Sequence, residues 1–182
     1  GALVSVSRNL SAASKNVFFT LDGNGYKLKG LSVTFGKGEN FAIFGYLNEK
    51  STIKNLVVEN CAINADTDAK NCAILAAEND GTILNCEIKN SVLSLKNVAN
   101  AGLAAAVNAG TISGTNVTGT QSNVSGASAA SHTIAANGTV GAVAGLNSGK
   151  ITGVSAINHH SIHAFVVHFG KAEAAFLQKE MA

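Results

Sequence analysis

Two short pairs of carboxylates are the residues of this 182-residue chain whose spacing could support catalysis. Asp66 and Asp68 stand two residues apart, and so do Glu78 and Asp80. Hydrolysis of a glycosidic bond needs two carboxylates that flank the bond. Both pairs fall in turn-like sequence, where aspartate is common because its side chain bonds the nearby backbone. We therefore expect no catalytic residue at these positions, and a calcium site made by these acids is a minor alternative.

Four of the five histidines lie between His159 and His168. The run His159-His160-x-x-His163 indicates a metal site at first sight, because imidazole is a common metal ligand. On a strand, however, His159 and His163 would share a face roughly 13 Å apart at ~3.3 Å per residue. His160 would point to the other face. We expect a histidine-rich last strand that covers one end of the fold, and neither a metal ion nor a cofactor.

The three cysteines, Cys61, Cys72 and Cys86, match no zinc-binding spacing and have no histidine near them in the sequence. Their odd number argues against a disulfide framework, so we expect small, buried and unreactive thiols. The lysines are scattered, and Arg8 is the lone arginine. A nucleic-acid surface would need a basic stripe, so we expect no nucleic-acid partner.

The composition indicates which elements must position these residues. Hydrophobic residues make up 46% of the chain, aromatic residues 5% and charged residues 13%, and proline is absent. A core of this composition is aliphatic and small, and the many glycines and asparagines favour short strands joined by turns. Disorder is excluded because disordered chains are poor in Ile, Val and Leu. No apolar run approaches eighteen residues, so we expect no membrane insertion.

One pattern recurs along the chain, and a shared asparagine marks each copy. Successive anchors are 31, 29 and 39 residues apart, a period typical of repeat architectures. The anchors are Asn48, Asn79, Asn108 and Asn147. Eight residues before them stand Asn40, Asn71, Asn100 and Thr139. Three residues before them, the residue is always tiny: Gly45, Ala76, Ala105 and Ala144. An isoleucine follows every anchor: Ile53, Ile83, Ile112 and Ile151.

The repeat predicts an all-β fold, a parallel β-helix or β-solenoid. Helical repeats are excluded because apolar residues alternate within short segments and no 3.6-residue stripe persists. Each copy would form one coil of two or three short strands, and equivalent strands of successive coils would pair in parallel. Stacking would place the isoleucines in the core and would let the asparagines form side-chain amide ladders. The tiny position would mark a bend or a close approach of two backbones.

We expect a single solenoid domain over residues 1–182, with about five coils in residues 21–163. Caps over residues 1–20 and 164–182 would protect the open ends, and the second cap would include a short helix. The start of a linker to a further domain is the alternative for that tail. The longest period contains an insertion over Gln121–Gly138, and such insertions usually emerge as loops on a binding face.

Stacking also makes two predictions about the surface. Glu78 and Asp80 would lie close to the coil that contains Glu49, which predicts a small acidic patch. The only Thr-x-Thr element, residues 118–120, does not recur from copy to copy. We therefore do not expect a threonine array of the kind that binds ice.

Residues 141–151, Gly-Ala-Val-Ala-Gly-Leu-Asn-Ser-Gly-Lys-Ile, closely resemble the GLUG motif, Gly-Leu-Val-Gly-x-Asn-x-Gly-x-Ile. The segments Leu21–Leu28, Phe44–Leu47 and Thr52–Leu56 resemble the leader coil of such repeats in gut Bacteroides-type proteins. The resemblance covers residues 18–160. It is weaker in the second and third copies, where Glu78 and Val107 precede the asparagine and alanine replaces glycine.

The GLUG motif occurs in bacterial surface and secreted proteins, including adhesin-like proteins and the non-catalytic region of some immunoglobulin A peptidases. The resemblance implies a right-handed parallel β-helix exported to the cell surface. The motif is structural, so the resemblance supplies no catalytic residues.

The leading hypothesis is a non-enzymatic β-helical module of a bacterial cell-surface or secreted protein, with an adhesion or spacer role within a larger chain. The expected partner is a host or cell-surface protein or a glycan. The alternative is a carbohydrate-active or carbohydrate-binding β-helix, similar to polysaccharide lyases and hydrolases. Its cleft would lie on the face that carries Asp66, Asp68, Glu78 and Asp80. The position of Arg8 in the cap and the lack of tryptophan both argue against it.

Overall fold

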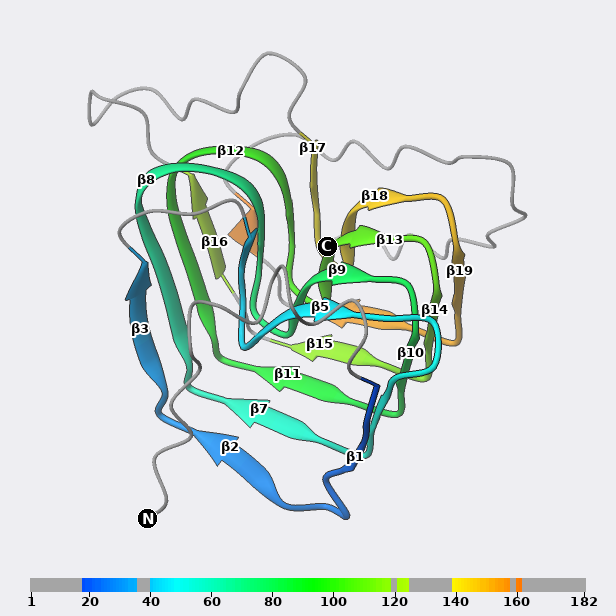
Figure 1. Ribbon diagram of the computed structural model, residues 1–182. Coiled ribbons are helices and arrows are strands. Elements are labelled where there is room, and N and C mark those ends of the chain that lie inside the picture. The colour runs from blue at the N-terminus through cyan, green and yellow to red at the C-terminus, as the bar shows by residue number, and fades with distance from the viewer. Residues whose placement is uncertain (1–17, 36–39, 119–120, 125–138, 158–159, 162–182) are drawn as a thin grey trace, which may run out of the picture.

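The computed structural model describes residues 18–35, 40–118, 121–124, 139–157 and 160–161. Only the backbone is described at residues 66–68, 96–97, 121–124, 157 and 160–161. These residues form a β-solenoid of about three turns, in which all paired strands are parallel and no helix occurs (Figure 1). The all-β solenoid prediction is therefore confirmed for the described part of the chain.

Each coil runs through four sheets in turn, which we call sheets A, B, C and D. Sheet A contains β1 (Thr20–Asp22), β6 (Thr52–Lys54), β10 (Thr82–Leu84), β14 (Thr111–Ser113) and β19 (Lys150–Thr152). Sheet B contains β2 (Lys27–Lys29), β7 (Val57–Glu59), β11 (Glu87–Lys89), β15 (Asn116–Thr118) and β20 (Ser155–Ile157). Sheet D contains β5 (Phe44–Leu47), β9 (Ala76–Asn79), β13 (Ala105–Asn108) and β18 (Ala144–Asn147).

Sheet C is the largest sheet and contains the two longest strands. Its main path contains β3 (Ser32–Phe35), β8 (Ala62–Ala73), β12 (Val92–Gly102), β16 (Gln121–Val124) and β21 (His160–Ser161). The short strands β4 (Asn40–Phe41) and β17 (Thr139–Gly141) pair with the second halves of β8 and β12. Figure 1 shows that β8 and β12 arch over before the chain enters sheet D. A register shift between Leu95 and Asn97 interrupts their pairing, as a β-bulge does where a strand bends.

Asparagine and glycine form the corners between the sheets. Asn55 and Asn85 have φ of 53° and 51° at the corner between sheets A and B, where later coils have Gly114 and Gly153. These residues tolerate the left-handed conformation that other residues avoid. Corner backbones also bond from coil to coil, as the Asn85 N–H does to the Ser113 carbonyl at 2.8 Å. The turn-forming role predicted for asparagine is thus observed at the corners.

The predicted isoleucine column forms the centre of the core. Ile53, Ile83 and Ile112 are paired in register from β6 to β14 and are fully buried. Ile151 continues the column in the last coil, where it is half-buried. Because each inner isoleucine packs between aliphatic neighbours, with Leu21 below Ile53, the column excludes water from every inner coil.

Asparagine ladders run along the stack at two of the predicted positions. In the first ladder, Asn79 Nδ2 donates to Asn108 Oδ1 at 2.6 Å, and Asn108 Nδ2 donates to Asn147 Oδ1 at 2.7 Å. In the second ladder, Asn100 Nδ2 donates to Asn71 Oδ1 at 2.8 Å, and Asn71 Nδ2 donates to Asn40 Oδ1 at 2.9 Å. The amide ladders are therefore confirmed.

The predicted alignment of the first copy is wrong within sheet D. Leu47, not Asn48, pairs with Asn79, and Phe44, not Gly45, pairs with Ala76. The first coil has one residue fewer between β4 and β5 and two residues more before β6, so one anchor cannot align the whole copy. Asn48 instead accepts hydrogen bonds from the Lys50 N–H and the Ser51 hydroxyl. The buried Asn79 Oδ1, next to Leu47, has no hydrogen-bond partner among the described residues.

The predicted insertion begins too early. Residues 121–124 form β16, which pairs with β12 and β21, so the strand pattern of the coil continues to Val124. Residues 125–138 lie outside the described residues. The predicted C-terminal cap, residues 164–182, also lies outside them, as do Arg8, His159, His163 and His168. Of the predicted N-terminal cap only residues 18–20 are described, and Thr20 already begins β1.

Candidate functional site

A cluster of polar side chains lies where the outer faces of sheets C and D meet, and we call it the Tyr46 cluster. Tyr46 on β5 and Glu78 on β9 are paired in register, and the neighbouring Leu47 and Asn79 are buried. Strand alternation therefore turns Tyr46 and Glu78 outward. The members of the cluster are Asn40, Tyr46, Glu49, Asn71, Glu78 and Asp80.

Glu78 terminates the second asparagine ladder. Its Oε1 accepts hydrogen bonds from Asn71 Nδ2 at 2.8 Å and from Asn40 Nδ2 at 2.9 Å. Asn71 is buried, so its amide needs these partners. The two amides hold the carboxylate of Glu78 against sheet C, and this leaves it as part of the ladder rather than as a free acid or base.

Asp80 follows β9 and accepts a hydrogen bond from the Tyr46 hydroxyl. This bond raises the pKa of Tyr46 to about 12, with further contributions from burial and from the negative charges of Asp80, Glu78 and Glu49. The three acids thus act on one phenol from two neighbouring coils. The predicted acidic patch around Glu49, Glu78 and Asp80 is therefore confirmed.

The other predicted acid pair lies in a different setting. Asp66 and Asp68 belong to β8, where Asp68 pairs with Asn97 just after the register shift. The expectation that they occupy a turn is wrong, and so is that expectation for Glu78, because both sites lie in strands. Only Asp80 follows a strand end. The sequence reasoning expected a turn at Asp66 and Asp68 because of their residue type. The chain instead bends inside β8, in a stretch that contains no glycine to mark the bend.

Two carboxylates of the Tyr46 cluster, Glu78 and Asp80, accept hydrogen bonds from neighbouring side chains. A glycosidase needs one carboxylate able to donate a proton and a second placed across the bond. Here Glu78 accepts from two amides and Asp80 accepts from a phenol whose pKa is raised. Among the described residues, no group of three or more His, Cys, Asp or Glu could hold a metal ion.

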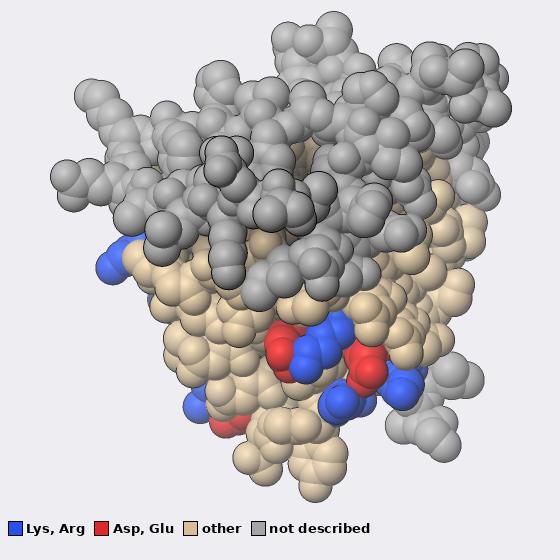
Figure 2. Space-filling model, turned by 180° about the vertical axis from the view of Figure 1, so that it is seen from behind, with Lys and Arg blue, Asp and Glu red and all other residues tan. Residues whose placement is uncertain are grey.

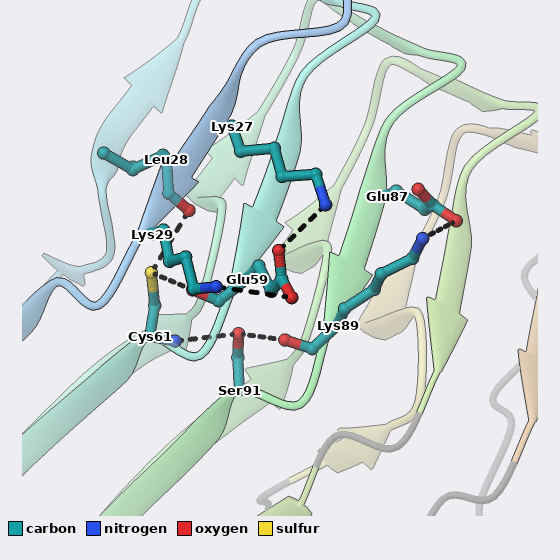
Figure 3. A network of polar contacts seen from close by, with 8 residues as sticks. All are labelled: Lys27, Leu28, Lys29, Glu59, Cys61, Glu87, Lys89 and Ser91. Carbon is teal, nitrogen blue, oxygen red and sulfur yellow. Dashed lines mark hydrogen bonds and ion pairs between the residues drawn. The ribbon is translucent and has the colours of Figure 1, made fainter.

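A second polar surface covers the outer face of sheet B (Figure 3). Lys27 Nζ lies 3.1 Å from Glu59 Oε2, and Lys29 Nζ lies 4.0 Å from Glu59 Oε1. Lys89 Nζ lies 2.7 Å from Glu87 Oε1. The hydrogen bond from Lys27, opposed by partial desolvation and aided by the lysine charges, holds the pKa of Glu59 below its ordinary value.

The charges on the sheet B face are therefore largely paired, with three lysines against two glutamates. Seen from behind, the described surface carries small groups of both signs and no large single-sign area (Figure 2). Exposed pairs of this kind contribute little to stability, typically 0–1 kcal/mol each. A surface of paired charges also gives little long-range attraction to a charged partner.

The three cysteines are free and buried, as predicted. Burial raises the pKa of Cys72 to about 12. Burial also raises the pKa of Cys86, although backbone hydrogen bonds with Leu56 and Leu84 oppose the shift. The Sγ of Cys61 contacts the carbonyl oxygens of Leu28 and Glu59, close to the surface pairs in Figure 3. Protonated, buried thiols are poor nucleophiles.

A column of threonines on the outer face of sheet A was missed by the sequence reasoning. Thr20, Thr52, Thr82 and Thr111 are paired in register across successive coils. A search for Thr-x-Thr along one strand cannot find a row that runs across strands. The available signal was the threonine that precedes Ile53, Ile83 and Ile112; in the last coil Lys150 takes this position. The next outward column is chemically mixed: Asp22, Lys54, Leu84, Ser113 and Thr152.

No family model, curated protein or solved structure matches this chain. The arrangement of its own residues is therefore the basis for a functional proposal. Among the described residues, we find no helix with the length and apolar character required to cross a membrane.

Proposed function

We propose that the chain is a non-enzymatic β-helical module of a bacterial cell-surface or secreted protein, with a role in adhesion or as a rigid spacer. In the proposed architecture the helix is right-handed, has about five coils and is capped at both ends. The resemblance to the GLUG motif supports the exported, bacterial setting. The proposed partner is a host or cell-surface protein or a glycan, and the module is part of a larger chain.

The observation that carries the proposal is that the polar groups of the stack bind one another. Asparagine amides form ladders between coils, lysines neutralise acids on sheet B, and the carboxylates of the Tyr46 cluster accept internal hydrogen bonds. An active site needs groups that stay poised toward a substrate. Side chains that are paired with one another favour a structural scaffold over a catalyst.

Rigidity follows from the same contacts. Backbone hydrogen bonds join each described coil to the next in all four sheets, and the core columns are fully buried in the inner coils. Buried polar ladders fix the register, because a one-residue slip would leave several amides without partners. A module of this kind holds whatever is attached to its ends at a set distance, which is the property required of a spacer.

Carbohydrate recognition or cleavage is the second candidate, and the Tyr46 cluster is the observation that favours it. Amides, carboxylates and an aromatic ring are groups that sugars bind through hydrogen bonds and stacking. Tyr46 is half-buried, and Asp80 is exposed, so part of the cluster is accessible. The cluster is the place where a glycan would bind if the adhesion role is exerted by the described residues.

A glycan array followed by an assay for release of sugar ends tests both candidates. Binding without turnover supports an adhesion module, and binding lost in Tyr46→Ala but kept in Glu59→Gln assigns it to the Tyr46 cluster. Release of sugar ends that disappears in Glu78→Gln and Asp80→Asn would overturn the non-enzymatic proposal. Binding of neither glycans nor host proteins, with the fold intact by circular dichroism, leaves the spacer role and contradicts adhesion.

A further inference from the structure

Aromatic residues occur only near the two ends of the chain. The chain has eight phenylalanines, two tyrosines and no tryptophan. The first group stands between Phe18 and Tyr46, and the second between Phe165 and Phe176; none stands between the two groups. The members of the second group are Phe165, Phe169 and Phe176. A solenoid core that is aliphatic throughout its inner coils therefore has aromatic residues available at both ends of the sequence.

The first coil shows what an end coil does with aromatic residues. Phe35 and Phe41 stack with ring centroids 4.7 Å apart, and the rings of Phe19 and Phe44 lie 5.8 Å apart. In the second coil, small residues pair with three of these phenylalanines: Ala65, Cys72 and Ala76. An inner coil has a neighbour on both sides, whereas the first coil has one, so the larger rings fill space that another coil would otherwise occupy.

The last coil has aliphatic residues where the first coil has rings. Val140 pairs with Ala101, and Ala144 pairs with Ala105, whose equivalents in the first coil are Phe41 and Phe44. The inner residues Ala101 and Ala105 are fully buried, but the apolar residues of the last coil are only half-buried: Val140, Val143, Ala144, Ile151 and Val154. Leu146, on the outer face of the same coil, is 37% exposed.

We propose that residues 162–182 dock on this end of the stack, with Phe165, Phe169 and Phe176 against the apolar residues of the last coil. The segment follows β21 directly, and β21 pairs with β16 at the same end of sheet C, so the segment starts beside the face that it covers. Ala172, Ala175, Phe176 and Lys179 recur at helical spacing, and the first three of these residues give the segment an apolar side.

This inference deepens the capped architecture of the proposed function, and it is independent of any partner. It also assigns the two ends different means of closure. The first coil covers its own end on the side of sheets C and D with rings that belong to its strands. The last coil depends on the chain that follows it.

Hydrogen exchange of the full chain tests the docking. The triple variant carries Phe165→Ala, Phe169→Ala and Phe176→Ala. Its amides in β18, β19 and β20 should exchange at least about tenfold faster than in the unsubstituted chain, because the segment that covers them is lost. Amides of β6 and β10 should keep their protection. The matched control is Phe18→Ala, which removes a ring that is 64% exposed and should leave the last coil unchanged. Equal exchange of β18–β20 in the triple variant and the unsubstituted chain would overturn the proposal.

Crosslinking of the unsubstituted chain provides a test that needs no variant to fold. A short amine-reactive crosslinker should join Lys150 of β19 to Lys171 or Lys179 within one molecule. Lys27 and Lys50, in the first coil, should not join to these lysines. A mixture of isotope-labelled and unlabelled chains distinguishes links within one copy from links between copies. Links only between copies, with a dimer by light scattering, would mean that a second copy covers the end and would overturn the proposal.

Discussion

Replacing Asn108 by leucine tests whether the buried asparagine ladder stabilises the stack. Asn108 is fully buried in the middle of the first ladder. It accepts a hydrogen bond from Asn79 Nδ2 at 2.6 Å and donates one to Asn147 Oδ1 at 2.7 Å. Leucine has a similar shape but can make neither bond, so the substitution removes the polar contacts while it keeps the volume nearly constant.

The expected cost follows from the two bonds and from the group left behind. Each hydrogen bond contributes about 1 kcal/mol, and a buried polar group without a partner costs ~1–3 kcal/mol. Asn79 Oδ1 already has no partner, and its Nδ2 would keep only the Thr111 carbonyl at 3.4 Å. Asn147 is half-exposed, so water can replace its lost donor. We therefore expect Asn108→Leu to lower the free energy of unfolding by roughly 2–4 kcal/mol.

Urea unfolding followed by circular dichroism measures this difference. With a slope of about 2 kcal/mol per molar urea, the middle of the usual range, the midpoint should fall by roughly 1–2 M. The matched control is Asn147→Leu at the half-exposed end of the same ladder. It removes the bond from Asn108 Nδ2, which keeps the Gly110 carbonyl at 3.5 Å, and the bond from Asn147 Nδ2 to the Gly149 carbonyl at 3.3 Å. It should cost about 1–2 kcal/mol, less than Asn108→Leu, because water reaches this end of the ladder. A slope that stays constant would indicate that the same cooperative unit unfolds in each variant.

One outcome would refute the reasoning. If Asn108→Leu unfolds at the same urea concentration as Asn147→Leu, or at a higher one, the buried ladder contributes nothing beyond its volume. The stability of the inner coils would then come from the isoleucine column and the backbone hydrogen bonds alone. The asparagines would have to be explained by specificity of register rather than by energy.

Three further predictions concern the thiols, the Tyr46 cluster and the corners. Cys72, with a pKa raised to about 12 by burial, should react with a thiol reagent at pH 8 only as fast as the chain unfolds; rapid reaction of the folded chain would contradict this. The folded pKa of Tyr46, about 12, lies above its ordinary value of 10.0, so the folded state holds a proton that the unfolded chain releases, and stability should fall as the pH rises from 10 toward 12. Asp80→Asn should lower this pKa in an ultraviolet titration of the phenol, and an unchanged titration would show that Asp80 is not its cause. At the corner, Asn85→Ala should lower the free energy of unfolding by roughly 1 kcal/mol, whereas Asn85→Gly should be nearly neutral; equal effects would argue against backbone conformation as the reason for asparagine.

The sequence predicted the stack because identical residues recur at matched positions. The isoleucines and the asparagines of the second and third copies lie in register as expected, because stacked coils are stabilised when identical side chains pack on one another. The acidic patch was predicted for the same reason, because a period places Glu49 near Glu78 and Asp80. The bond between Tyr46 and Asp80 was not predicted, because it depends on the slip of the first coil that brings Tyr46 into register with Glu78.

Other features could not be predicted because they depend on the shape of a coil rather than on its period. The arch of β8 and β12 places Asp66 and Asp68 inside a strand, although their residue types favour a turn. The threonine column runs perpendicular to the strands, so no pattern along one strand reveals it. The first copy departs from the others because an end coil must fill space that inner coils share. Repetition therefore predicts the inner coils well and the ends poorly.

The matching corners and core columns mean that the coils are interchangeable units. Ile83 and Ile112 each pair with an isoleucine above and below, and Asn55 and Asn85 make the same corner. A duplicated copy of the 29-residue coil from Asn79 to Val107 would present matching partners on both sides. It would lengthen the stack by ~4.8 Å without a new kind of contact. The reach of such a protein can therefore change during evolution in discrete steps, by recombination between repeats, while its ends stay the same.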